Sequence, residues 1–305
     1  MNALEELAAR VTRGERITDA DARIAEASPD LLGIGMMADE IRRRMHGART
    51  TFVRVFEVHV ETPLVALPPG LAAGEVRIIG RPPSLDAAVL AVRAAAGQRV
   101  GVPLTGFAMN DVEELARTTG DTLAGVSAAL RDAGLDGISE LPLDAVSDAA
   151  AATQAARGAG LSVMRLTVHD PGDARIPTLI LARIPTLMIA RELQSVAGGF
   201  KAFAPLPRTQ SVSAPSTGYD DVKHVALARM LVDNIESIQV DWALYGPKLA
   251  QVALTVGADD MDNVAAIDAG TLGTRRSPIE EIRGNIRAAS LDPVERNGRF
   301  EFLPS

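Results

Sequence analysis

The sequence predicts an α/β protein of the TIM-type (β/α) barrel class. The chain has 305 residues, of which 47% are hydrophobic, enough for one barrel of about 250 residues and a terminal extension. Seven strand-like stretches alternate with helical patterns over roughly 240 residues, which is typical of a parallel sheet with helical crossovers. No G-x-G-x-x-G motif follows these strands, so a closed barrel is favoured over an open dinucleotide-binding sheet. We expect a helical extension at residues 1–50 and a barrel with a C-terminal helix at residues 51–305.

The elements can be assigned in chain order. Helices of the extension are expected at residues 3–13, 19–27 and 30–45, the last ending before Gly47 because glycine commonly follows a helix. Residues 51–60 (TFVRVFEVHV) are rich in β-branched and aromatic residues, which predicts the first strand. Further strands are expected at residues 75–79, 99–105, 137–139, 161–168, 200–204 and 238–244. Helices are expected at residues 85–96, 111–118, 121–133, 145–158, 220–234, 247–256 and 277–289, with one more ending near residue 196.

Composition excludes several classes of site. The chain has no cysteine, which excludes disulfides, thiolate nucleophiles and cysteine-held metal clusters. Its net charge of −8 argues against nucleic-acid binding, which needs clustered Lys and Arg. No apolar stretch of about 18 residues is present, so we expect no membrane span and a cytoplasmic protein.

A tandem repeat interrupts the alternation. Residues 174–181 (ARIPTLIL) are followed directly by residues 182–189 (ARIPTLMI). Eight residues are close to two helical turns, yet Pro177 and Pro185 would each remove a helical hydrogen bond. The repeat is either a slippage duplication tolerated on the outer surface of the barrel or a lengthened apolar helix that contacts a partner.

Several blocks of sequence resemble one family. The blocks are residues 31–47 (LLGIGMMADEIRRRMHG) with 51–54 (TFVR), 198–207 (GGFKAFAPLP), 217–234 (TGYDDVKHVALARMLVDN) and 242–262 (WALYGPKLAQVALTVGADDMD). They resemble the aminofutalosine synthase and dehypoxanthine futalosine cyclase family, radical-SAM barrel enzymes of the futalosine route to menaquinone. The tail at residues 280–296, which ends in DPVER, resembles aminofutalosine synthase rather than the cyclase. The resemblance covers most of the chain except residues of about 55–75, and it implies a radical-SAM-like barrel.

The departure from the family lies after the first strand. The family's C-x-x-x-C-x-x-C loop and the following helix should stand there, whereas residues 55–74 read VFEVHVETPLVALPPGLAAG. Without thiolates we expect no iron–sulfur cluster. Because the second predicted strand begins already at residue 75, we also expect a shortened first crossover. Binding of S-adenosylmethionine is in question too, because Arg81 stands in the glycine turn that the resemblance assigns to the ammonium group of that cofactor.

Candidate site residues lie where predicted strands end, since ligands of parallel barrels bind at that face. Candidates for ligand binding by position are Arg81, Asn110, Glu140, Arg208, Tyr245 and Lys248. The resemblance adds Asp259, Asp260 and Asp262 at the top of the barrel, although a capping and turn cluster explains these residues equally well. Candidates for catalysis are Glu57, His59 and His169, and weak candidates for a metal site are His59, Glu61 and His169. Solvated residues on a strand face are the alternative for the Glu57–His59–Glu61 series.

Three functions remain open on this sequence. The first is a non-radical pseudoenzyme of menaquinone biosynthesis that binds a small-molecule ligand or a pathway enzyme. The second is an active enzyme that uses acid–base or metal chemistry on a related enolpyruvyl or nucleoside substrate. The third is a structural subunit of a radical-SAM partner, and a homodimer is also possible. No cofactor, nucleic-acid partner or membrane partner is expected.

Overall fold

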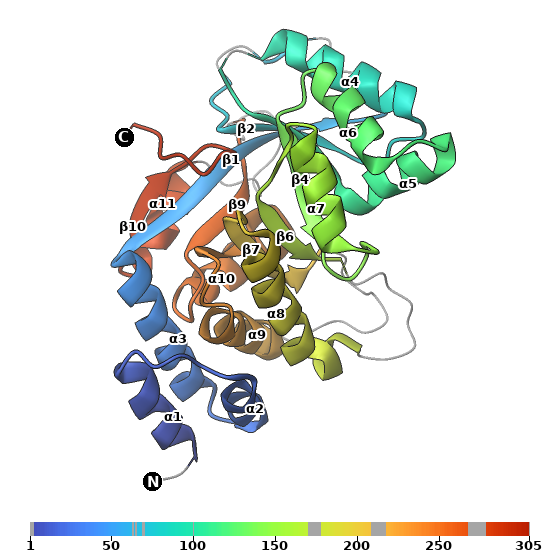
Figure 1. Ribbon diagram of the computed structural model, residues 1–305. Helices are drawn as coiled ribbons and strands as arrows, with labels where there is room; N and C mark the ends of the chain where they lie inside the picture. The colour runs from blue at the N-terminus through green and yellow to red at the C-terminus, as the bar shows by residue number, and fades with distance from the viewer. Residues whose placement is uncertain are drawn as a thin grey trace.

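The computed structural model describes residues 3–62, 64, 66–68, 71–99, 101–169, 178–208, 218–267 and 279–304, with the backbone alone for residues 178–182. Figure 1 shows a ring of strands surrounded by helices, with α1, α2 and the start of α3 below it. No described helix combines the length and the apolar character needed to cross a membrane.

Eight parallel strands close into a barrel, which confirms the predicted fold class. In ring order they are β1 (Arg49–His59), β2 (Glu75–Ile79), β3 (Leu104–Ala108), β4 (Gly137–Pro142), β6 (Arg165–Val168), β7 (Ala202–Pro207), β8 (Ser237–Asp241) and β9 (Asp260–Ala265). Pairing of β9 with β1, with Thr51 opposite Asp260, closes the ring. The short β5 (Ser162–Val163) pairs with β4, and β10 (Asp292–Glu295) pairs with the first residues of β1.

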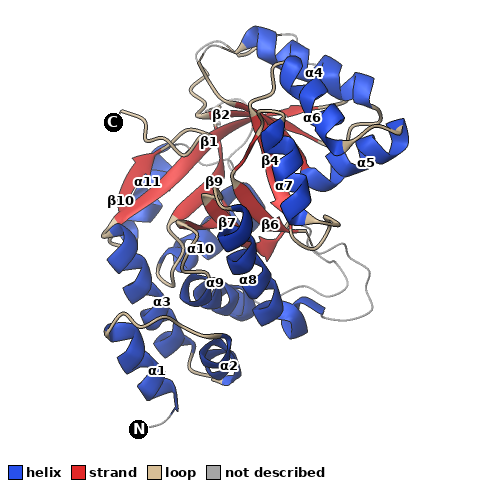
Figure 2. Cartoon of the chain, in the orientation of Figure 1, coloured by secondary structure: helices blue, strands red, loops and turns tan. Residues whose placement is uncertain are grey.

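Helices cover the outside of the ring (Figure 2). They are α4 (Leu85–Gln98), α5 (Met109–Thr119), α6 (Leu123–Asp132), α7 (Ala149–Gly158), α8 (Thr178–Ala197), α9 (Gly218–Leu231), α10 (Trp242–Leu254) and α11 (Ile279–Ala288). The extension consists of α1 (Ala3–Thr12), α2 (Asp19–Ala27) and α3 (Leu31–His46), as predicted. Thr18 forms a capping box with Asp21 at the start of α2, and Asp30 caps α3. Helix α3 packs on α9, which attaches the extension to the barrel.

Two strands were missed by the sequence prediction. Strand β9 (DMDNVA) was expected to be a turn or capping cluster, and β10 (DPVE) was expected to be part of a tail. Charged side chains interrupt the apolar pattern in both strands. In β9, Asp260 and Asp262 face polar partners inside the ring. The third strand also begins later than expected, at Leu104 rather than at residue 99.

The connection between β1 and β2 is short. None of the described residues between His59 and Glu75 is helical, which agrees with the predicted loss of the first crossover helix. Gly74 passes so close to the C-terminal segment that a Cβ there would lie 2.7 Å from the Arg296 carbonyl oxygen. The described residues of the first crossover therefore supply no helix to cover the end of β1, where a barrel usually has one.

Part of the tandem repeat lies inside α8. The helix begins at Thr178 and continues through Pro185, with Ile184 and Leu187 buried. Residues 174–177 of the first copy lie outside the described residues. Ile189 of the second copy is exposed, so a surface role for this helix stays a prediction.

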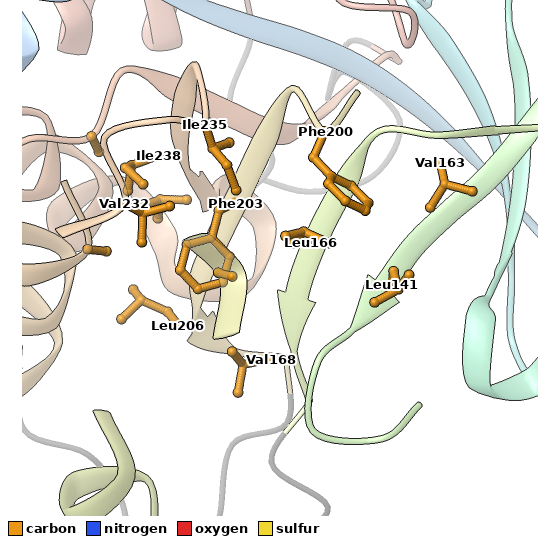
Figure 3. Close-up of a cluster of buried hydrophobic side chains, with 14 of the residues drawn as sticks. Leu141, Val163, Leu166, Val168, Phe200, Phe203, Leu206, Val232, Ile235 and Ile238 are labelled. Atoms are coloured by element: carbon orange, nitrogen blue, oxygen red, sulfur yellow. The ribbon is translucent and has the colours of Figure 1, made fainter. Parts of the chain in front are cut away.

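The apolar core lies between the ring and the helices. Figure 3 shows Phe203 and Leu206 of β7 beside Val232, Ile235 and Ile238. Phe203, Val232 and Ile238 are fully buried. The interior of the ring is filled differently, by paired polar side chains, and these build the site.

Candidate functional site

The base of the barrel interior is closed by ionic pairs. Arg296 donates to both oxygens of Asp260, at 2.7 Å from Nε and 2.6 Å from Nη2. The same carboxylate accepts hydrogen bonds from Thr51 and from Gln239 at 2.6 Å. Phe300 stacks on the Arg296 guanidinium at 3.9 Å. The C-terminal segment therefore seals the end of the ring at which the strands begin.

A second layer lies above this base. Arg77 of β2 pairs with Glu75 at 2.9 Å and with Asp262 of β9 at 2.9 Å. Arg165 of β6 contacts Asp262 at 3.2 Å and donates to the Ser139 carbonyl oxygen. Burial disfavours the charge of Asp262, but Arg165 and Arg77 outweigh it and hold the pKa of that carboxyl well below its usual range.

The third layer faces the open end of the ring. Arg208, directly after β7, pairs with Glu140 at 3.2 Å, with Asp241, and with Asp262 at 3.4 Å. His169, directly after β6, lies 2.8 Å from Glu140. Burial would raise the pKa of Glu140, but Arg208 and His169 lower it to about 2. Burial would lower the pKa of His169, but its hydrogen bond to Glu140 raises it above the usual value.

A polar cavity of about 280 Å³ opens above this layer and is called the mouth cavity below. Its walls include Glu57, Arg81, Asp111, Glu140, His169 and Arg208. Arg81 is 69% exposed and lies only loosely beside Asp111, at 3.8 Å. Burial raises the pKa of Asp111, and Arg81 offsets only part of this effect. Arg81 is therefore the wall cation with the weakest ionic contacts.

An apolar cavity of about 420 Å³ adjoins the mouth cavity at the ends of β1 and β9. Phe56, Ile79, Trp242 and Pro247 line it, and Glu57, Ile79 and Asn263 line both cavities. The two cavities therefore form one opening with a polar and an apolar half. Together they are comparable in size to small-molecule sites, which measure about 300–1,000 Å³.

Backbone strain is concentrated at this opening. Among the described residues, four non-glycine residues have positive φ, and two of these, Phe107 (60°) and Asn263 (58°), line the mouth cavity. Such conformations cost about 1–3 kcal/mol each and recur at binding sites. Two of these strained positions therefore lie on the wall of the mouth cavity.

The structure brings part of the predicted site together. Glu57, Arg81, Glu140, His169 and Arg208 line the mouth cavity. Asn110 does not line it, and neither does Tyr245, whose hydroxyl donates to the Pro207 carbonyl oxygen. Lys248 and Glu61 are exposed outside both cavities. Arg81 and Arg208 do not form a joint anion site, because three carboxylates already occupy Arg208.

The aspartate cluster at residues 259–262 does not line the top of the barrel, which corrects the placement implied by the resemblance. Asp259 lies below β9, where it pairs with Arg229 and accepts from the Ile238 amide. Asp260 belongs to the base and Asp262 to the second layer. All three carboxylates are buried and ion-paired, so they are not placed to bind a ligand.

The weak metal candidates are not assembled into one site. His59 lies at the end of β1 beside the apolar cavity, whereas His169 pairs with Glu140 across the mouth cavity. Within the described part of the chain, no three His, Asp or Glu side chains converge as metal ligands would.

Sequence reasoning missed Glu75, Arg77, Arg165, Asp241 and Trp242. Sequence signals were available for three of these residues. Glu75 and Arg77 stand at i and i+2 in a five-residue strand, which places both on one face. Arg165 interrupts the apolar run LSVMRLTV, and a charge inside a buried strand needs a partner.

Comparisons with known proteins confirm the predicted resemblance. Residues 197–305 match the family model described as the CofH/MqnC C-terminal region. Aminodeoxyfutalosine synthase of Streptomyces coelicolor is 37% identical over 134 residues, covering 37% of this chain and 35% of the relative. The Methanococcus maripaludis 5-amino-6-(D-ribitylamino)uracil–L-tyrosine 4-hydroxyphenyl transferase is 32% identical over 129 residues, or 37% of this chain and 36% of the relative. Both matches span only about a third of the relative's length.

A longer match and two solved structures extend this result. Aminodeoxyfutalosine synthase of Thermus thermophilus is 25% identical over 351 aligned positions, covering 96% of this chain and 94% of the relative. That alignment is longer than the chain, so the relative has residues without a counterpart here. Methylornithine synthase (TM-score 0.58, 12% identity, 94% and 97% coverage) shares the fold. So does the FeFe-hydrogenase maturase HydG of Carboxydothermus hydrogenoformans (TM-score 0.62, 12% identity, 95% and 79% coverage).

The iron–sulfur cluster that the resemblance implies does not fit the residues of this chain. A four-iron four-sulfur cluster is held by cysteine thiolates, and the sequence contains no cysteine. The space at the end of β1 is lined largely by apolar side chains, among them Phe56 and Trp242.

Proposed function

We propose that this chain is a non-radical relative of aminodeoxyfutalosine synthase that binds a small organic ligand in the mouth of its barrel. The observation that supports this most strongly is the polar-walled mouth cavity, kept open in a chain that has no thiolate for a cluster. A purely structural barrel has no need for an open cavity with strained backbone at Phe107 and Asn263.

The same proposal places the chain in the futalosine route to menaquinone. Two relatives named aminodeoxyfutalosine synthase support this context, one matched over 37% of this chain and one over 96% of it. The Methanococcus relative is named as a different transferase, so the relatives do not agree on one ligand. The ligand of this chain therefore has to be identified by experiment. A pathway enzyme docked on the barrel is the alternative partner.

Mass spectrometry tests the proposal. The protein is purified under native conditions, denatured, and its released small molecules are identified, while native spectra record complexes with chorismate-like carboxylates and nucleosides. We expect a bound organic molecule at a stoichiometry near one per chain. If neither a co-purified molecule nor any member of the panel binds, the ligand-binding function is wrong and the structural-subunit alternative leads.

Reconstitution tests the non-radical part separately. Anaerobic incubation with iron and sulfide should leave no stable chromophore at about 400 nm, because a cluster needs thiolate ligands. A stable cluster with stoichiometric iron and sulfide would contradict the proposal even if a ligand binds.

A second candidate function is acid–base catalysis by His169 and Glu140. The favouring observation is their 2.8 Å contact on the wall of the mouth cavity. Glu140 favours the protonated imidazole, since it raises the pKa of His169, so His169 would act as the acid. Turnover of a bound ligand that disappears in His169→Gln, with ligand binding retained, would support this function.

A further inference from the structure

We propose that the apolar cavity beside the mouth binds an organic cation, an amine with an apolar or aromatic body, and that Glu57 holds its charged group. This inference rests on the proposed ligand-binding mouth and specifies the chemistry of one half of it. Four features carry it: an unpaired carboxylate, its position between two cavities, the apolar walls, and the pairing of the neighbouring cations.

Glu57 differs from two other glutamates of the barrel strands, Glu75 and Glu140. Glu75 is fully buried and paired with Arg77, and Glu140 is paired with Arg208 and His169. Glu57 is exposed, and within the described residues its carboxylate has no ion pair or hydrogen bond. A carboxylate without a partner on a cavity wall can accept a charge-assisted hydrogen bond from a ligand.

The position of Glu57 joins the two halves of the opening. It lies on β1 and lines both the mouth cavity and the apolar cavity. Among the described residues that line the apolar cavity, it is also the only Asp, Glu, Lys or Arg. A ligand whose charged end meets Glu57 can therefore place its apolar body in the adjoining cavity.

The apolar walls suit a hydrophobic or aromatic body. Phe56, Ile79, Trp242 and Pro247 line the cavity. Aromatic residues make up only 3% of the chain, and Trp242 is its one tryptophan. An aromatic ring near a cation adds attraction through its π face, so these walls favour an amine over a neutral or anionic molecule of the same shape.

Neighbouring cations do not cancel this preference. Arg77 of β2 stands opposite Glu57 in the strand pairing. Its guanidinium is bound to Glu75 and Asp262. Arg81 lies beside Asp111 and Glu114, at 3.8 and 3.7 Å. The charge of Arg77 is thus fully paired and that of Arg81 is partly offset, whereas Glu57 has no ionic partner among the described residues.

Trp242 supplies the readout for the test. Because it is the only tryptophan of the chain and lines the apolar cavity, its fluorescence reports on that cavity directly. The probes are 2-phenylethylamine, 2-phenylethanol and 3-phenylpropionate, which share a phenyl body and differ in charge. We expect the amine to change Trp242 emission saturably and to bind at least about tenfold more tightly than the alcohol. Equal or tighter binding of the alcohol or the carboxylate, or no response to any probe, would overturn the inference.

Two matched pairs of variants locate the effect. Glu57→Gln should remove the preference for the amine, whereas Glu61→Gln, an exposed position in the turn after β1 and outside both cavities, should keep it. Ala243→Leu should fill the apolar cavity and weaken all phenyl probes, whereas Ala151→Leu, an exposed alanine in the first turn of α7, should not. Equal effects within either pair would contradict the assignment.

These outcomes are separate from those of the proposed function. Failure of the amine series with binding of a carboxylate or nucleoside in the mass-spectrometry panel would remove the inference and leave the ligand-binding mouth intact. Failure of that panel with a Glu57-dependent amine response would leave the apolar cavity as the only supported site.

Discussion

The base and the mouth of this barrel use the same residue types in opposite ways. At the base, Asp260 is fully buried and every charge meets a partner, with Arg296 bound to both of its oxygens. At the mouth, Glu57 is exposed without a partner and Arg81 has only loose contacts. An Asp, Glu or Arg in a barrel is therefore structural or available according to how completely it is buried and paired.

The largest effect should come from breaking the paired layers. Asp262→Asn removes the countercharge shared by Arg77, Arg165 and Arg208, and removal of one partner from a buried ionic group typically costs about 3–5 kcal/mol. We expect a loss of this size in the free energy of unfolding, measured by urea denaturation. Glu57→Gln is the control and should change stability by no more than about 0.5 kcal/mol. Similar losses in both variants would break the comparison between base and mouth.

An intermediate effect is expected on acidification. The folded pKa of Glu140 is lowered to about 2, so its carboxylate stabilises the fold above the ordinary Glu value of about 4.3, and this contribution is lost as the pH falls through the folded pKa. Stability should therefore fall below about pH 4. Glu140→Gln should make that fall shallower, as measured by urea denaturation at a series of pH values. An unchanged pH profile would show that Glu140 is not held in its ion pairs.

A smaller effect of opposite sign is expected from His169. Its folded pKa is raised by Glu140, so protonated His169 contributes stability below its unfolded pKa of about 6.5, and this is lost as the pH rises through the folded pKa. His169→Gln should therefore flatten the stability profile above about pH 6.5 and leave the acid limb in place. Imidazole NMR titration gives the folded pKa directly, and a value below about 6.5 would contradict the pairing.

Much of the fold could be predicted because local sequence patterns determine many of its helices and strands. Periodicity and capping residues predict the three helices of the extension and strand β2. The Pro and Gly content of residues 62–74 predicts a connection without a helix, and the residues described there are not helical. Strand β9 could not be predicted in this way, since its alternate residues Asp260 and Asp262 face ionic partners instead of an apolar core. A filled polar barrel interior removes the hydrophobic alternation by which strands are recognised.

The candidate site could be predicted only in part, for a related reason. Strand ends predicted that polar side chains would gather at one face, because parallel strands bring their ends together there. The residues that line the mouth cavity from this prediction are Glu57, Arg81, Glu140, His169 and Arg208. Which of these residues remain available depends on partners distant in sequence. Arg208 is occupied by Glu140 on β4, Asp241 on β8 and Asp262 on β9, and no local pattern reveals that pairing.

The central claim is that the mouth is available to a ligand, and Arg81 provides its most direct test. Arg81 and Arg117 both contact Glu114 and are similarly exposed, at 69% and 71%, but only Arg81 lines the mouth cavity. Thermal unfolding is measured for wild type, Arg81→Ala and Arg117→Ala with the carboxylate and nucleoside panel. The account predicts a ligand that, at 100 times its Kd, stabilises wild type and Arg117→Ala by about 2.7 kcal/mol and Arg81→Ala by clearly less. Stabilisation by no ligand, or equal stabilisation of all three proteins, would contradict it.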